Sequence, residues 1–217
     1  MKTPGQPLFE DLEQTAKEFF RNSSGSHDWD HTLRVVRLGL VIGEREGADP
    51  DVVVAGAYLH DIGRNGPDEP SVHVCHAQRG ASLAKEILAR FPFSRQQKEN
   101  IIHCIAAHRF RRPPEPSTLE AKVVFDADKL DAIGAVGIAR AYLFAGEIGA
   151  RLHSPDIDVE KAPAYSADDT GYREYLVKLR KIKDRMLTGA GKEMAVNRHR
   201  FMETFFKRFL DEYEGRL

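Results

Sequence analysis

The run from Val52 to Asp61 reads VVVAGAYLHD, and it decides how the rest of the chain is interpreted. Asp49-Pro50, just before it, supplies a helix N-cap and a proline at the first helical position. The run therefore predicts a helix, although three successive valines alone would also suit a strand. A helix this apolar is expected to be buried, so Asp61 at its end needs a cationic partner, because an unpaired buried carboxylate is costly. A solvent-exposed helix end is the alternative at this point.

The rest of the chain also predicts helices separated by short breaks. Apolar residues recur at helical spacing in the segments 9–19, 28–46, 76–91, 94–108 and 117–149, and again after 171. Ser94 with Gln97, and Ser117 with Glu120, predict capping boxes, and a bend is expected near Ile133-Gly134. Residues 151–170 show no periodicity and predict a loop. No segment predicts a strand, so the expected fold class is all-α, a compact helical bundle.

The composition of the chain argues against several classes of function. The 217 residues carry 32 Lys+Arg against 33 Asp+Glu, a balance that argues against binding a long nucleic acid. No basic segment followed by an apolar one marks a signal peptide, and no apolar run approaches the roughly 20 residues of a membrane span, so a cytoplasmic protein without membrane contact is expected. Nine histidines against two cysteines predict that any metal chemistry uses imidazole and carboxylate ligands. Cys75 and Cys104 fit a reducing compartment and a core position.

Two further polar residues interrupt apolar helical stripes. His31 lies in line with the apolar residues Val35, Leu38 and Ile42, where a lone histidine is more often a hydrogen-bonded core residue than a ligand. Asp128 lies in the apolar segment VVFDAD, three residues before Asp131. Taken with His60-Asp61, these residues form a plausible mixed nitrogen and oxygen site. Ligand type alone does not choose between manganese, iron, magnesium, nickel, cobalt and zinc.

The other histidines divide into two classes. His76 and His108 share the pattern of a polar residue on an apolar stripe, so both are candidates for a site role. His103 lies off that stripe. A surface position is the simplest expectation for it and for three histidines in loop-like or basic surroundings: His73, His153 and His199.

The ordered set His31, His60-Asp61 and Asp128 resembles the HD superfamily of metal-dependent phosphohydrolases. The segments HDWDHTLRV (27–35) and ADKLDAIG (127–134) resemble motifs of its small stand-alone bacterial members. The resemblance covers about residues 20–145. It implies a single all-α HD domain over residues 1–217, with the C-terminal helices 171–215 packed on the motif core. It also implies a divalent metal held by His31, His60, Asp61 and Asp128, with Asp61 at the catalytic centre.

Two more segments extend the resemblance. HAQRGA (76–81) and CIAAH (104–108) resemble the places where binuclear members carry two further histidines. Whether His76 and His108 bind a second metal or contact substrate phosphate stays open. Nucleotidase-like members carry a glutamate shortly after the His-Asp pair, whereas Arg64 stands three residues after Asp61 here. This departure argues against a glutamate-assisted mechanism.

The function implied is hydrolysis of a phosphoester or phosphoanhydride bond in a nucleotide or similar small phosphorylated substrate. The metal is expected to polarise a phosphoryl oxygen and to activate the attacking water. Lys129 and Arg64 are the catalytic candidates for neutralising phosphate charge, and Arg34 and Arg109 are further substrate candidates. Asp131 is a candidate for orienting a ligand or water.

Two other function classes remain. One is a di-iron HD-fold oxygenase, because six possible ligands are present when His76 and His108 are counted. The other is a non-catalytic helical module that binds nucleotides. An oligomer is also possible, because the C-terminal helix carries four phenylalanines between residues 201 and 209.

Overall fold

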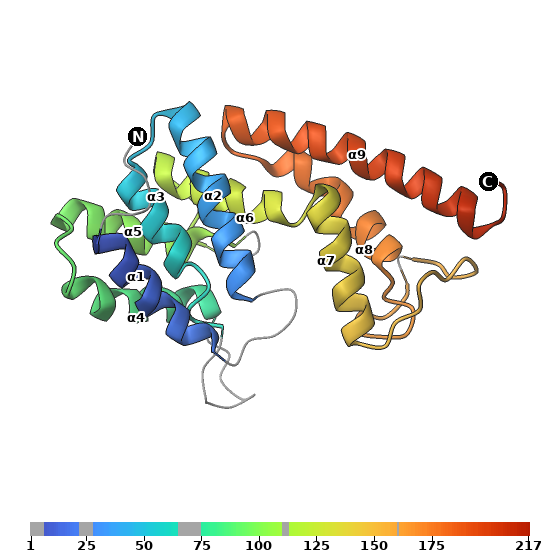
Figure 1. Cartoon of the computed structure of the whole chain (residues 1–217), viewed down its shortest axis with the longest axis horizontal. Helices are drawn as coiled ribbons and strands as arrows, with labels where there is room; N and C mark the ends of the chain where they lie inside the picture. The colour runs from blue at the N-terminus through green and yellow to red at the C-terminus, as the bar shows by residue number, and fades with distance from the viewer. Residues whose placement is uncertain (1–6, 22–27, 65–74, 110–112, 160) are drawn as a thin grey trace. The chain divides into compact units, whose positions relative to one another are not determined.

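The computed structural model describes residues 7–21, 28–64, 75–109, 113–159 and 161–217. Within these ranges the chain forms nine α-helices and no strand, so the all-α prediction is confirmed (Figure 1). The helices are α1 (Pro7–Lys17), α2 (Trp29–Glu46), α3 (Pro50–Leu59), α4 (His76–Ala89), α5 (Arg95–Ala107), α6 (Leu119–Asp131), α7 (Gly134–Glu147), α8 (Gly171–Val177) and α9 (Gly189–Tyr213). Short 3-10 helices add η1 (Glu18–Phe20) and η3 (Leu179–Arg185). His27 and His73 lie outside the described residues.

The chain divides into two compact units, Met1–Asp128 and Lys129–Leu217, with the boundary inside α6. The first unit holds α1 to α5 and most of α6, and the second holds α7, α8, η3 and α9. The single domain over residues 1–217 and the packing of the C-terminal helices on the motif core stay predictions. No helix among the described residues has the length and apolar character needed to cross a membrane.

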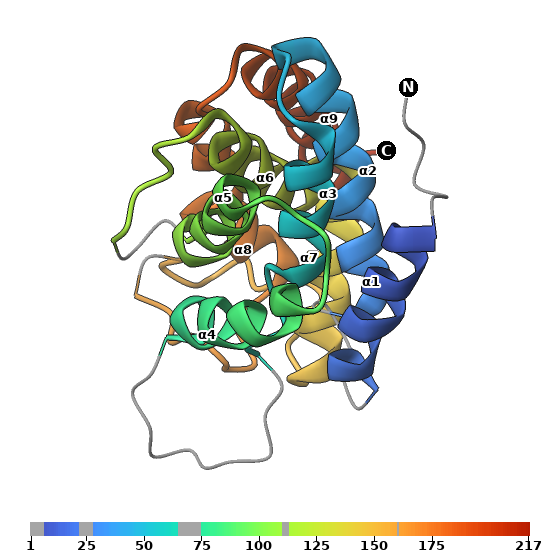
Figure 2. The ribbon, with the colours of Figure 1, turned by 90° about the vertical axis from the view of Figure 1, so that its left-hand side faces the viewer.

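Helix α3 is the centre of the first unit. Every residue from Val52 to Leu59 is buried, as its apolar sequence predicts. Figure 2 shows α3 between α2 and α5, and it contacts both, as well as α1. Gly56 permits this close packing, because a Cβ there would lie 3.0 Å from the Cβ of Cys104 on α5 and 3.3 Å from Val124 on α6. The helix ends at His60-Asp61, which are 0% and 1% exposed, so the solvent-exposed alternative is wrong.

Local signals set most of the helix ends in this unit. Asp49 accepts a hydrogen bond from the Asp51 N–H at the start of α3, and Asp28 accepts one from the His31 N–H at the start of α2. The Ser94 capping box of α5 is present as predicted. An aromatic pair joins α2 to α3, where the rings of Trp29 and Tyr58 stack with their centroids 6.0 Å apart.

The second predicted capping box is wrong. Thr118, not Ser117, caps α6, because its hydroxyl accepts the Ala121 N–H at 3.2 Å. Glu120 reaches away from the helix end and accepts hydrogen bonds from the Asp49 N–H at 3.0 Å and the Asn100 amide at 2.8 Å. The glutamate therefore ties the starts of α3 and α6 to α5.

The second unit is built around α9, which packs on α7 and η3. The break between α6 and α7 falls where the bend was expected, and Gly134 takes a positive φ of 79° there. The described residues of the predicted loop 151–170 form turns without a helix or strand. Ser154 donates a hydrogen bond to Asp168 within that loop, at 3.0 Å.

Candidate metal centre

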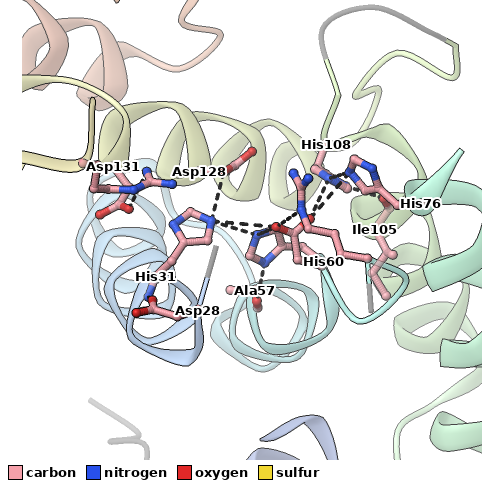
Figure 3. A network of polar contacts seen from close by, with 12 residues as sticks. Asp28, His31, Ala57, His60, His76, Ile105, His108, Asp128 and Asp131 are labelled. Atoms are coloured by element: carbon pink, nitrogen blue, oxygen red, sulfur yellow. Dashed lines mark hydrogen bonds and ion pairs between the residues drawn. The ribbon is translucent and has the colours of Figure 1, made fainter. Parts of the chain in front are cut away.

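His60, directly after α3, points toward His31 in the close-up (Figure 3). His60 and the next residue, Asp61, are both buried in the first unit. His60 Nδ1 lies 2.7 Å from the Ala57 carbonyl oxygen. Because a carbonyl oxygen only accepts, Nδ1 carries the proton, and the neutral ring offers its Nε2 lone pair to the site. The Nε2 atom of His31, on α2, lies 3.3 Å from His60 Nε2. The Oδ1 atom of Asp128, on α6, lies 3.4 Å from His31 Nε2. His31, His60 and Asp128 form the first group.

A second group repeats this arrangement with α4 and α5. His108, directly after α5, donates from Nδ1 to the Ile105 carbonyl oxygen at 2.7 Å, so its Nε2 is also directed inward. His76, the first residue of α4, brings its Nε2 to 3.3 Å from His108 Nε2. His108 is 1% exposed, whereas the His76 side chain is 17% exposed. His76, His108 and Asp61 form the second group.

Asp61 lies between the two groups and contacts both. Its Oδ2 is 3.5 Å from His60 Nε2 and 4.0 Å from His31 Nε2. Its Oδ1 is 3.4 Å from His108 Nε2 and 3.7 Å from His76 Nε2. The ligand atoms of each group lie within 4.8 Å of one another. The structure thus brings together all six ligand candidates named from the sequence.

The electrostatics of the two groups differ. Burial alone would raise the pKa of Asp61, but His60, His108 and Arg64 outweigh it and hold the pKa well below its usual range. Burial likewise opposes charge on His60, yet Asp61 and Asp128 raise the pKa of His60. The opposite holds for the second pair, since burial lowers the pKa of His108 and, together with the charge of Arg64, lowers the pKa of His76 to about 3. The first group therefore favours positive charge, and the histidines of the second group stay neutral.

The donor set fits a divalent metal. Two imidazole nitrogens 3.3 Å apart need a proton or a cation between them, and this distance occurs in both groups. Imidazole nitrogens with carboxylate oxygens are the ligands of zinc, iron, nickel and manganese sites in proteins. The carbonyl groups of Ala57 and Ile105 also supply the outer support that metal-binding histidines usually have. The residues present thus fit one metal at the first group and a second one at the other.

The cation that the sequence requires opposite Asp61 is Arg64, whose Nε lies 2.5 Å from Asp61 Oδ2. The two residues are three apart on a helical turn, and this spacing alone could have identified the pair. A second contact was missed from the sequence. Arg109, directly after His108, donates from Nη1 to the Cys75 sulfur at 2.9 Å, and Cys75 directly precedes His76. This contact joins the start of α4 to the end of α5.

Arg34 and Lys129 are the other two residues expected to contact the phosphate of a substrate. Arg34 lies on α2 one turn after His31, and Lys129 follows Asp128 on α6; both are partly buried. Their contact with phosphate stays a prediction.

Asp131 has a structural partner in the second unit, where it is 1% exposed and receives a hydrogen bond from Arg140 Nη1 at 2.9 Å. A role of Asp131 in orienting a ligand stays a prediction.

Of the four histidines expected at the surface, the three that the structure describes each contact another side chain. His103 accepts a hydrogen bond from the Ser117 N–H at 3.0 Å. His199 lies 3.3 Å from a carboxylate oxygen of Glu203, and its side chain is only 13% exposed. His153 is partly buried among aromatic rings, with its centroid 4.9 Å from that of Tyr213. His153 and His199 are therefore partly buried, not fully exposed: His153 packs against aromatic rings, and His199 pairs with a carboxylate one turn along α9.

Comparison with known proteins places this centre in a family. The HD domain model matches residues 28–133, which include all six ligand candidates. YpgQ of Bacillus subtilis is 34% identical over 211 residues, covering 95% of this chain and 94% of that protein. Ribonuclease Y of Treponema denticola is 28% identical over 114 residues, 52% of this chain, and the match spans only 20% of that larger protein.

Solved structures agree with these matches. The crystal structure of YpgQ in complex with ADP aligns with a TM-score of 0.71 at 33% identity, over 94% of this chain and 96% of that one. An HD-superfamily hydrolase of Bacillus thuringiensis aligns with a TM-score of 0.74 at 28% identity, over the same shares of the two chains. The chain belongs to the HD-domain family, among small stand-alone members that include HD-superfamily hydrolases.

Proposed function

We propose that this protein is a metal-dependent phosphohydrolase that cleaves a phosphoester or phosphoanhydride bond of a nucleotide or similar small phosphorylated substrate. One observation carries the proposal. Four imidazole Nε2 atoms, from four different parts of the chain, lie within 4.0 Å of the two oxygens of the buried Asp61 carboxylate. A buried carboxylate that faces four imidazole nitrogens would suit a metal-binding role better than a purely structural one.

His31, His60, Asp128 and Asp61 would hold one divalent metal ion, and His76 and His108 would hold a second with the other oxygen of Asp61. When bound, such ions supply Lewis acidity and lower the pKa of a coordinated water, which is the chemistry that phosphate-ester hydrolysis requires at neutral pH. The identity of the metal is proposed only as a divalent transition metal or magnesium.

The chain's own groups prepare the centre for this chemistry. The carbonyl groups of Ala57 and Ile105 keep protons on the outer ring nitrogens of His60 and His108, so the inner nitrogens are available as ligands. The low pKa of Asp61 keeps it ionised throughout the neutral range. Arg64 pairs with Asp61, and Arg109 contacts Cys75 next to His76, so both would supply permanent positive charge for a phosphate. No carboxylate stands three residues after Asp61 to act as a base, so water activation would depend on the metal centre itself.

A nucleotide is the favoured class of substrate because YpgQ, which aligns over almost the whole chain, has been crystallised with ADP. The balanced charge of the chain supports a small ligand over a long polyanion. The match to ribonuclease Y covers the HD domain only and does not extend to the rest of that protein. The proposed partner is therefore a small phosphorylated molecule, and the proposed location is the cytoplasm.

The test is the Asp61→Ala variant, with bound metal measured by elemental analysis and hydrolysis measured over a matrix of metals and nucleotides. Free phosphate and pyrophosphate are recorded separately, because their ratio shows which bond breaks. Both metal content and hydrolysis should be lost. Asp30→Ala is the matched control, since Asp30 is exposed and adjacent to His31. Wild-type-like metal content and activity in Asp61→Ala would contradict the proposal.

The same experiment separates the other function classes. A ligand set of four histidines and two aspartates also suits a di-iron oxygenase, so iron content and the optical spectrum are compared after aerobic and anaerobic purification. Iron-dependent oxygen consumption without hydrolysis would support the oxygenase. Tight nucleotide binding without turnover in any metal would support the binding module.

A further inference from the structure

Arg64 occupies a position that the proposed metal centre also needs. Its Nε lies 2.5 Å from Asp61 Oδ2, which is the oxygen that faces His60 and His31. Arg64 follows Asp61 on the same turn, where the Arg64 N–H donates to the Asp61 carbonyl oxygen at 3.0 Å. The Arg64 side chain is thus paired with the carboxylate, and its backbone N–H is bonded to the main-chain carbonyl oxygen of the same residue.

The charges explain why this pairing forms. Asp61 is 1% exposed, so its carboxylate requires a cation whenever no metal is bound. A guanidinium stays charged at every accessible pH and forms strong hydrogen bonds to carboxylates, which makes Arg64 a suitable substitute. Its charge also reaches the second group, since it is a main cause of the low pKa of His76. The Arg64 side chain is 30% exposed, so it has a route to solvent that Asp61 lacks.

We infer that Arg64 is the internal counter-cation of the metal-free centre and competes with the divalent metal for Asp61 Oδ2. The two cations cannot share this oxygen without strong repulsion, because two positive charges this close repel each other, and burial weakens the screening between them. Arg64 must therefore leave Asp61 before the first group can use the whole carboxylate. This inference rests on the proposed metal centre. It adds that Arg64 lowers the affinity of the centre for metal and stabilises the metal-free protein.

The inference predicts two changes of opposite sign when the guanidinium is removed. Arg64→Gln should bind manganese more tightly, by roughly tenfold, which lies within the usual range of coupling between two binding events. The same variant without metal should melt at a lower temperature, by about 5 °C or more, because it removes the permanently charged partner of a buried carboxylate. A purely structural role for Arg64 would weaken both properties together.

The experiment measures manganese binding by calorimetry and by electron paramagnetic resonance on protein stripped with a chelator, with melting followed in parallel. Arg90→Gln is the matched control, because Arg90 is exposed at the end of α4 and its removal changes net charge equally. Tighter binding with a lower melting temperature in Arg64→Gln alone supports the inference. Unchanged or weaker binding in Arg64→Gln, while the wild type binds manganese, overturns it and leaves the proposed function standing. A wild type that binds no manganese overturns both.

A second measurement covers the case in which Arg64→Gln does not fold without metal. The Nε–H proton of Arg64 in the wild type should give a protected nuclear magnetic resonance signal in the metal-free protein, assigned by its absence from Arg64→Lys. Adding diamagnetic zinc should shift or remove that signal in proportion to the metal bound. A signal that persists unchanged in the zinc-loaded protein would overturn the inference.

Discussion

The two halves of the centre are built alike but carry different charge. Each has a pair of imidazole nitrogens 3.3 Å apart, and each has one histidine whose Nδ1 donates to the carbonyl oxygen three residues before it. The first group adds a second carboxylate, Asp128, whereas Arg109 lies beside the second group through its contact with Cys75. Arg64 pairs with the Asp61 carboxylate between the two groups. Accordingly, the pKa of His60 is raised and the pKa of His76 falls to about 3.

The difference in charge indicates that the two groups differ in their affinity for a metal. The first group has the additional carboxylate, so we expect it to hold a metal more tightly. The second group is less negative and more exposed at His76, so a metal there would be held weakly and a substrate phosphate would meet fewer repelling charges. Similar geometry therefore does not imply equal affinity, and each prediction below changes one half while leaving the other in place.

The largest effect is expected from the carboxylate that only the first group has. Asp128→Ala should lose the tightly bound metal and reduce hydrolysis by roughly a thousandfold or more, because several kcal/mol of charge stabilisation depends on the metal. Metal content by elemental analysis and kcat by phosphate release are the measurements. Retention of one metal equivalent with near-normal kcat would show that the first group is not the tighter site.

A smaller effect is expected in the second group. His108→Ala should keep about one metal equivalent while hydrolysis falls roughly 10- to 100-fold, the range typical of losing support for a metal site. His103→Ala is the control on the same helix, because His103 contacts Ser117 and neither group. If His108→Ala loses all metal, the two groups form one indivisible site and the comparison fails.

The sequence predicted the first group better than the second. His31, His60, Asp61 and Asp128 could be named as candidates because polar residues that interrupt a buried apolar stripe are costly without partners, and the resemblance then implied them as a ligand set. The direction of each imidazole could not be predicted from spacing. It depends on hydrogen bonds such as that from His60 Nδ1 to Ala57, and on the packing of α2 and α6 around α3.

Contacts between distant segments were harder to predict. Cys75 and Arg109 are 34 residues apart and meet only because α4 packs on α5. Gly63 contributes to the same junction, since a Cβ there would lie 2.1 Å from the carbonyl oxygen of His76. None of these three residues stands out in the hydrophobic periodicity of the sequence. Periodicity indicates which face of one helix is buried, but it does not show where two helices approach each other.

Removing the contact between Cys75 and Arg109 should have a smaller effect on the second group. Cys75→Ala removes the sulfur that orients Arg109 and should reduce hydrolysis about fivefold, equivalent to one hydrogen bond of about 1 kcal/mol. Metal affinity at the first group should not change. Cys75→Ser keeps an acceptor and should recover most of the activity; equal loss in both variants would mean that the contact does not position the site.

The smallest effect is a pH dependence of stability in the metal-free protein. The folded pKa values of His76 and His108 are lowered, so below about pH 6.5 the unfolded chain binds protons that these residues in the folded chain do not. These two histidines therefore lower the free energy of unfolding as pH falls from about 6.5 toward 5. His60, whose pKa is raised in the folded protein, increases the free energy of unfolding over the same interval. Urea unfolding in chelator should show a net loss of about 1–2 kcal/mol over this interval, since each net proton is worth 1.36 kcal/mol per pH unit.

His76→Gln should flatten that decline, because it removes one of the two depressed titrations. His199→Gln is the control, since that residue pairs with Glu203 on α9 and belongs to neither group. A decline that is equally steep in His76→Gln and the wild type would place the pH dependence elsewhere in the molecule.

The stacked pair of Trp29 and Tyr58 gives the protein an optical reporter of its own. Trp29 is the only tryptophan in the chain, and it precedes His31 by two residues just as Tyr58 precedes His60. Any adjustment of α2 against α3 as the two histidines close on a ligand would change the ring overlap, and with it the emission of a single fluorophore. We therefore expect loading of the first group to change the intrinsic fluorescence, which would be followed in real time without a label and without turnover.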